Sequence, residues 1–149
     1  MKETDYLPEV IATFLKSQSL ITLASCERDV PYCAYCFYSF EPGQDSLVFK
    51  SDKDSRHIKE GLINSRVAGT VAPPSLKFSE LTGLQFQGTL SSPSGSALTR
   101  AKLSYYKKYP LALAMPGHLW LIHLDYIKMT DNRIKFGHKT IWDKLNQPV

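Results

Sequence analysis

The residues of this chain best suited to chemistry lie where an apolar run gives way to hydroxyl groups and cations. Residues 47–57 read Leu-Val-Phe-Lys-Ser-Asp-Lys-Asp-Ser-Arg-His, and Ser55 is a good N-cap residue for a helix over Arg56–Ile63. The start of a helix presents unpaired backbone N–H groups and the positive end of the helix dipole, so it attracts anions. The sequence therefore indicates a site for a phosphate monoester, with the alternative of an ordinary capped helix and solvated lysines. The residues of this site would be Lys50, Ser51, Lys53, Ser55, Arg56 and His57.

Two of the three cysteines, Cys33 and Cys36, match a C-x-x-C pattern. The pattern lies inside an aromatic-rich run that predicts a strand over Tyr32–Phe40, where positions three apart face opposite sides of a sheet. The two thiols therefore diverge, and no second C-x-x-C or histidine pair completes a metal site. We interpret the cysteines as small buried apolar residues, which predicts neither a redox dithiol nor a metal centre.

Length and composition predict one ordinary globular domain over residues 1–149. Hydrophobic residues make up 43% of the chain and charged residues 21%, with a formal net charge of +4. Such a mild charge is compatible with an anionic ligand and does not argue for nucleic acid. No apolar run reaches the length of a membrane span, and an odd number of cysteines is not a secreted disulfide framework. These features predict a cytoplasmic protein without a membrane partner.

Periodicity along the chain favours strands with peripheral helices. Helices are predicted over Leu7–Lys16, with Thr4 or Asp5 as the cap, and from about Ser94 to Tyr109. Connections of hairpin length favour a small antiparallel barrel over a parallel sheet. The predicted strands are Leu20–Cys26, Tyr32–Phe40, Ser46–Ser51, Arg66–Ala72, Leu84–Leu90, Leu119–Met129 and Arg133–Phe136.

No motif of the chain supplies a catalytic group of its own. The glycine-rich signatures of dinucleotide and P-loop sites are not present, nor is a G-x-S-x-G nucleophile elbow. A chain without a nucleophile, general base or metal site either binds a ligand only or takes its chemistry from a cofactor.

The segment from Phe49 to His57, followed by Arg66-Val67-Ala68, resembles the FMN-phosphate segment of the pyridoxamine 5'-phosphate oxidase-like split-barrel flavoproteins. The likeness extends from the N-terminal helix to the strand at Trp120, and the tail is similar to that of a short bacterial branch. It implies a mainly β fold with peripheral helices, a six-stranded antiparallel split β-barrel. It also implies a homodimer with one FMN in each of two clefts between the subunits.

The resemblance implies that Ser51, Ser55 and Arg56 hold the FMN phosphate, with Lys50 and Lys53 nearby. This chain departs from the family at Ser51, where threonine is usual. It departs again one residue after Arg56, where histidine stands in place of a common lysine. The C-terminal arginine motif that recognises pyridoxal phosphate in the family's vitamin oxidases is not found in the sequence.

The resemblance also implies residues around the isoalloxazine ring. The strand that carries Tyr35, Cys36 and Phe37 would lie along the ring edge and offer backbone hydrogen bonds. Trp142 would either stack on the ring or seal the tail to the barrel as a hydrophobic clamp. The residues that could reach the ring from the partner subunit are Gln85, Lys139 and Trp142.

These expectations lead to an FMN-dependent oxidoreductase acting on a small-molecule substrate. The alternative is a binding or carrier protein that holds flavin or haem without turnover. A third reading, ranked last, is a single-stranded nucleic-acid platform on the lysine- and tyrosine-rich helix before Pro110, and we expect no nucleic-acid partner.

Overall fold

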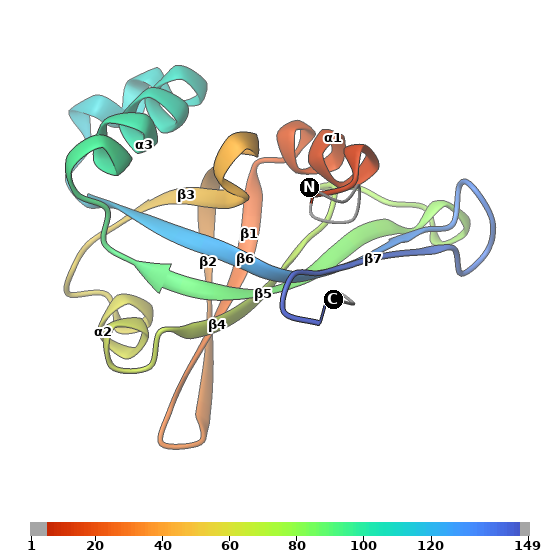
Figure 1. Ribbon diagram of the computed structural model, residues 1–149, viewed down its shortest axis with the longest axis horizontal. Helices are drawn as coiled ribbons and strands as arrows, with labels where there is room; N and C mark the ends of the chain where they lie inside the picture. Colours follow the sequence, from red (N-terminus) through yellow and green to blue (C-terminus); the bar gives the residue numbers. More distant parts are fainter. Residues whose placement is uncertain (1–5, 147–149) are drawn as a thin grey trace.

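The computed structural model describes residues 6–146, which form a mainly antiparallel β structure with three α-helices (Figure 1). The α-helices are α1 (Glu9–Ser17), α2 (Arg56–Ile63) and α3 (Gly95–Lys108), and the short 3-10 helices are η2 (Pro42–Gln44), η3 (Phe78–Glu80) and η4 (Pro110–Ala114). The strands are β1 (Leu20–Glu27), β2 (Val30–Glu41), β3 (Ser46–Ser51), β4 (Arg66–Val71), β5 (Thr82–Ser91), β6 (His118–Asp131) and β7 (Lys139–Asp143).

Six of the strands close into a ring. The sheet runs β3-β2-β1-β4-β5-β6-β7, and β3 also pairs with β6, so β1 to β6 form a closed circuit and β7 is added along β6. Every pairing is antiparallel. The prediction of a six-stranded antiparallel split-barrel fold is confirmed.

Alternation along the strands fills the ring with apolar side chains. In β5, Leu84, Phe86 and Leu90 are buried while Gln85 and Gln87 are exposed, as a strand with one buried face requires. This alternation decides which residues of each strand remain available to a ligand on the outside of the ring.

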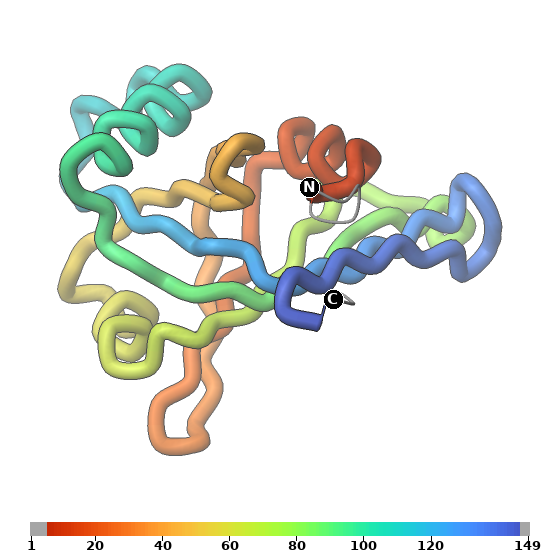
Figure 2. Tube along the Cα trace, in the orientation of Figure 1, coloured from red at the N-terminus to blue at the C-terminus, as the bar shows by residue number. Residues whose placement is uncertain are grey.

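The helices cover different parts of this ring, as the tube in Figure 2 shows from the same side. Helix α1 buries Phe14 and Leu15 in the main core, and the Tyr38 hydroxyl of β2 donates to the Leu15 carbonyl at 2.7 Å. Helix α3 packs on the outside, where Ala101 and Tyr105 form a second apolar cluster with residues of β3 and β6. Helix α3 therefore covers part of the outer face of β3 and β6.

One predicted strand differs from the structure. Residues 133–136 are not a strand but a turn, and the last strand, β7, begins later, at Lys139. Side chains of the turn explain the difference: the Asp131 carboxylate accepts the backbone N–H of Arg133 at 3.0 Å, and the Asn132 side chain accepts that of Gly137 at 2.8 Å. Such local bonds compete with strand pairing.

The first helix begins after Pro8, whose carbonyl accepts the N–H groups of Ile11 and Ala12. The predicted caps Thr4 and Asp5 lie outside the described residues. Among residues 6–146, no helix combines the length and the apolar character needed to cross a membrane.

Candidate functional site

Two hydroxyl groups and an imidazole converge where β3 passes into α2. The Ser51 Oγ lies 3.2 Å from the Ser55 Oγ and 2.8 Å from the His57 Nε2. Ser51 ends β3 and Ser55 is the N-cap of α2, so the strand and the helix start fix these groups in place. Ser55 makes no side-chain capping bond, and the first N–H groups of a helix have no intrahelical acceptor. We call Ser51, Ser55 and His57 the serine corner.

The His57 imidazole is half-buried between the two serines and the ring interior. Its Nε2 lies 4.0 Å from the Cys36 Sγ, and its ring centroid lies 6.4 Å from that of Phe49. Burial lowers the pKa of His57 below its ordinary value of 6.5, and the nearby Glu60 carboxylate opposes this shift. The imidazole is therefore neutral at pH 7 and shares one hydrogen bond with Ser51.

Arg56 is held by two neighbours at the first turn of α2. Its Nε donates to the Glu60 Oε1 at 2.7 Å, and its guanidinium carbon lies 4.1 Å from the centroid of the Tyr32 ring. Glu60 is buried, and its other oxygen accepts the Ser25 hydroxyl at 2.5 Å. The Ser25 hydroxyl and the Arg56 guanidinium lower the pKa of Glu60. Neither Nη group of Arg56 takes part in these bonds, which leaves both for an anion.

The two lysines of the predicted phosphate segment differ in placement. The Lys50 ammonium donates to the carbonyls of Ala112 and Met115, both at 2.7 Å, and lies 5.1 Å from the centroid of the Tyr106 ring. The carbonyls at the end of the short helix η4 need such a donor, which explains why Lys50 turns toward them. Lys53 is exposed. Lys50 is therefore engaged by main-chain carbonyls, whereas Lys53 lies at the surface.

An apolar cleft adjoins the serine corner, with a volume of about 400 Å3. We call it the aromatic cleft. Cys36 joins the two sites, because it lines the cleft and contacts His57. The residues that line it are Tyr35, Cys36, Phe37, Lys50, Tyr105, Tyr109, Leu111, Ala112, Met115 and Pro116. Four of the predicted cofactor residues are thus brought together in one cleft.

Helix α3 is tied to β2 and forms a wall of this cleft. The Lys108 ammonium donates to the carbonyls of Gln18 and Tyr38, and the Tyr109 hydroxyl donates to the Tyr38 carbonyl at 2.6 Å. Burial lowers the pKa of Lys108 and raises that of Tyr105 to about 12. Lys108 and Tyr109 are therefore engaged with the main chain of the protein.

Gln85, Lys139 and Trp142 lie away from the aromatic cleft within the same chain. Gln85 is exposed on β5, and the Lys139 ammonium donates to the Thr130 hydroxyl at 2.9 Å. In Figure 1, β7 and α2 lie on opposite sides of the view. Trp142 is 2% exposed and packs in the main core, with its indole N–H unpartnered. This placement favours the clamp over stacking, and Gln85 and Lys139 would meet a cofactor only through a second subunit.

The cysteines separate as the strand geometry predicts. Cys33 is exposed and Cys36 is buried, so they face opposite sides of β2, while Cys26 is partly exposed. The expectation that all three are buried is therefore wrong for Cys33, because it lies on the outward face of β2. Burial raises the pKa of Cys36 to about 12, so it is a thiol at neutral pH. Within residues 6–146, no cluster of three or more metal-ligating side chains is found.

Sequence reasoning missed the residues that hold Arg56. Glu60 follows Arg56 by one helical turn, a spacing that favours an ion pair, and this signal was available from the sequence. The contributions of Ser25 and Tyr32 were not, because these residues come from β1 and β2, far from α2 in the sequence.

The chain is similar in sequence to proteins from Yersinia. A UPF0306 protein of Yersinia pseudotuberculosis serotype O:3 (strain YPIII) is 37% identical over 136 residues, which cover 91% of this chain and 92% of that protein. A UPF0306 protein of Yersinia pestis shows the same identity and coverage. Comparison with protein-family models gives no match.

Solved structures share the fold at low identity. A heme binding protein from Mycobacterium smegmatis superposes with a TM-score of 0.76 at 14% identity, covering 93% of this chain and 59% of its own. A FAD-binding protein from Mesorhizobium loti gives 0.67 at 14%, covering 81% and 92%. A pyridoxamine 5'-phosphate oxidase candidate from Listeria innocua gives 0.64 at 16%, covering 81% and 95%. The fold is therefore one that occurs among proteins named for flavin or haem.

Proposed function

The chain belongs to the UPF0306 family, and from that premise we propose that it is an FMN-binding flavoprotein and an oxidoreductase for a small-molecule substrate. The observation that carries the proposal is the serine corner beside an aromatic cleft. Hydroxyl groups, an imidazole and a helix start lie at one end, and planar aromatic side chains line the space next to them. A flavin nucleotide combines the two matching parts, a phosphate and a planar ring.

The residues of this chain would bind and orient the cofactor. Ser51 and Ser55 would donate hydroxyl hydrogen bonds to the phosphate, and the Nη groups of Arg56 would form two parallel bonds with it. Tyr35 and Phe37, which line the aromatic cleft, would exclude water from the ring. FMN, when bound, supplies hydride and single-electron transfer.

A homodimer would complete this site. Side chains at the mouth of the aromatic cleft are largely exposed in the single chain, Tyr35 by 82% and Leu111 by 87%. Exposed apolar groups around a cleft are typical of a surface that a partner covers. The second subunit would bring Gln85 and Lys139 to the ring, which one chain cannot do. We assign the protein to the cytoplasm, where its three free thiols would stay reduced.

A carrier for flavin or haem without turnover is the second candidate. It is favoured by the high pKa of the Cys36 thiol, which leaves the cleft without a reactive nucleophile at neutral pH, and by the likeness in fold to a heme binding protein. The aromatic cleft would accept either planar ring. The serine corner, however, suits a compact phosphate better than the longer propionate side chains of haem.

A titration of the apoprotein distinguishes these candidates. We expect FMN to bind at micromolar concentration, with its fluorescence quenched by the protein. Riboflavin should bind more weakly because it lacks the phosphate. Steady turnover with NADH or NADPH and an electron acceptor would identify the enzyme. Haem that binds more tightly than FMN would support the carrier, and no binding of FMN would remove the main proposal.

The titration of His57 tests whether the phosphate lies at the serine corner. In the free protein its pKa lies below 6.5 because burial disfavours the imidazolium. A dianion nearby favours the charged form, so saturating FMN should raise this pKa. NMR of the histidine ring protons between pH 5 and pH 8 measures it, roughly spanning the range in which histidine titrates. His57→Gln assigns the signal, and an unchanged pKa with FMN bound would place the phosphate elsewhere.

A further inference from the structure

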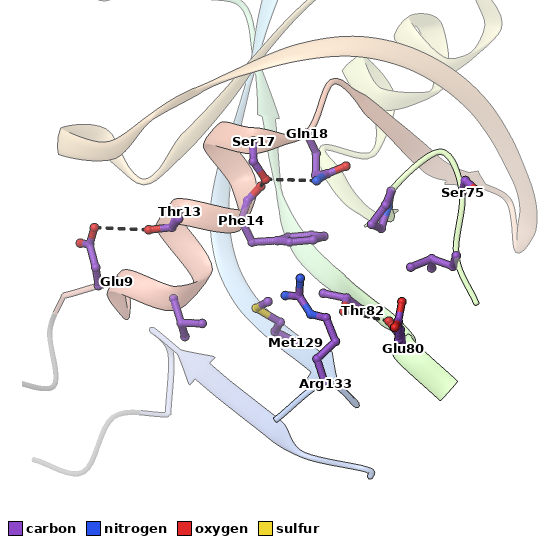
Figure 3. A pocket seen from close by; sticks show the side chains of 13 residues that line it. Glu9, Thr13, Phe14, Ser17, Gln18, Ser75, Glu80, Thr82, Met129 and Arg133 are labelled. Carbon is purple, nitrogen blue, oxygen red and sulfur yellow. Dashed lines mark hydrogen bonds between the residues drawn. The ribbon is translucent and has the colours of Figure 1, made fainter. Parts of the chain in front are cut away.

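A second cavity lies under helix α1, between that helix, the β4–β5 connection and the turn after β6 (Figure 3). Its volume is about 560 Å3, within the range of small-molecule sites. It shares no lining residue with the aromatic cleft. Neither the fold comparison nor the proposed function assigns anything to it, and we call it the α1 cavity.

The floor of the α1 cavity is apolar and firmly packed. Phe14 of α1 is 7% exposed and Met129 of β6 is 2% exposed, so each is packed in the core and only a small part of its side chain faces the cavity. Val10 lies one helical turn before Phe14 on the same face of α1, and Leu76 of the β4–β5 connection also lines the cavity. Both are 40% exposed. An apolar group of modest size would remove this surface from water.

A single guanidinium is fixed at the side of this floor. The Arg133 Nε and Nη2 donate to the two oxygens of Asp131 at 3.0 and 2.9 Å, and the Thr82 hydroxyl also donates to Asp131 at 3.3 Å. Asp131 is 5% exposed, so the carboxylate that holds Arg133 is itself rigid. Figure 3 shows the Arg133 side chain directed into the cavity, on the side of Phe14 and Met129. A guanidinium has five N–H donors, and the remaining ones are free to meet a ligand there.

Two carboxylates, those of Glu80 and Glu9, line the same cavity, and Glu80 is the one that acts on Arg133. Glu80 lies close enough to raise the pKa of Arg133 by its charge, and Figure 3 places both side chains along one side of the space. Because Asp131 already neutralises Arg133, a simple anion would meet the guanidinium but also the repulsion of Glu80. A simple amine would pair with Glu80 but would leave the remaining N–H donors of Arg133 without an acceptor. A ligand that carries both charges avoids either penalty.

We propose that the α1 cavity binds a free α-amino acid with an apolar side chain. The carboxylate of the ligand would pair with Arg133 and its ammonium group with Glu80. Its side chain would cover Phe14 and Met129. This combination uses the fixed donor, the opposite charge and the apolar floor at once, and it does not depend on a flavin.

L-leucine and its two fragments test the proposal by isothermal titration calorimetry at pH 7. We expect L-leucine to saturate with a dissociation constant on the order of 1 mM or below. The fragment without the ammonium, 4-methylpentanoate, and the fragment without the carboxylate, 3-methylbutylamine, should each bind at least about tenfold more weakly, because each leaves one charged partner unpaired.

Two variants and a control identify the site. Glu80→Gln should weaken L-leucine about tenfold and leave 4-methylpentanoate unaffected or tighter, because repulsion of the carboxylate is removed. Arg133→Gln should weaken the binding of L-leucine and leave that of 3-methylbutylamine unaffected. This variant also removes the ion-pair partner of the buried Asp131. Glu80 is exposed, so its variant keeps the test valid if Arg133→Gln unfolds. The control is Lys135→Gln, an exposed cation of the same turn.

The proposal is overturned if L-leucine shows no saturable heat up to about 50 mM. It is also overturned if both fragments bind as tightly as L-leucine, or if Glu80→Gln leaves the affinity for L-leucine unchanged.

Discussion

Arg56→Ala should lower the affinity for FMN by about 10- to 100-fold and leave the affinity for riboflavin nearly unchanged. The guanidinium would contribute two charge-assisted hydrogen bonds to the phosphate, and such bonds are worth about 1.5–3 kcal/mol. Riboflavin lacks the phosphate, so the ratio of the two dissociation constants isolates this contact from any general effect on folding. Fluorescence titration of each apoprotein measures both constants.

The matched control is Lys53→Ala, which removes an exposed cation three residues earlier. It should reduce FMN affinity only by the weak, salt-dependent effect of a solvated charge. An equal loss in the two variants would show that Arg56 acts through charge alone. An Arg56→Ala protein that keeps the full preference for FMN over riboflavin would place the phosphate away from this helix start.

Glu60 lets the same experiment probe how Arg56 is held. Glu60→Ala removes the acceptor of the Arg56 Nε, and we expect part of the preference for FMN to be lost with it. Glu60→Gln keeps an oxygen in the same position and should restore that preference. If Glu60 served only the stability of the fold, both ligands would weaken together and their ratio would stay constant.

Trp142→Ala should destabilise the protein by about 3–5 kcal/mol, the largest stability effect that we expect from one substitution in β7. The indole is 2% exposed within the main core, so its removal leaves a cavity that the strand cannot close. Denaturant unfolding followed by circular dichroism measures the change. Trp142→Phe should cost less, because it keeps an aromatic ring and removes the unpartnered buried N–H.

The same variants decide between the two readings of Trp142. A hydrophobic clamp predicts that Trp142→Phe binds FMN with wild-type affinity under conditions in which it is folded. Ile141→Ala, at the neighbouring and exposed position of β7, is the control and should change stability little. A Trp142→Phe protein of normal stability with FMN affinity reduced several-fold would instead support contact with the ring.

Periodicity was sufficient for the strands of the ring and for the boundaries of α2. The alternation of Gln85 and Phe86 and the helical spacing after Ser55 are local signals, and the structure has both as predicted. The turn at residues 133–136 was mistaken for a strand because Ile134 and Phe136 alternate with lysine and arginine. The side-chain bonds of Asp131 and Asn132 overrode that weak pattern.

The candidate site was predictable only in part, because some of its contacts are local in sequence and others join distant segments. The serine corner lies within seven residues of sequence, Ser51–His57, so its approximate composition could be read directly. The direction of Lys50 could not, because its acceptors at Ala112 and Met115 follow helix α3. The closure of β3 against β6 brings those distant segments together.

The width of the aromatic cleft follows from how its outer wall is attached. Three side chains attach it to main-chain carbonyls: Lys50 binds that of Met115, Lys108 that of Gln18 and Tyr109 that of Tyr38. A carbonyl is present whatever residue occupies the position, so mutations at those acceptor sites would leave the attachments in place. During evolution, the surface facing the ligand could therefore diversify freely, while the two lysines and the tyrosine would be expected to change least.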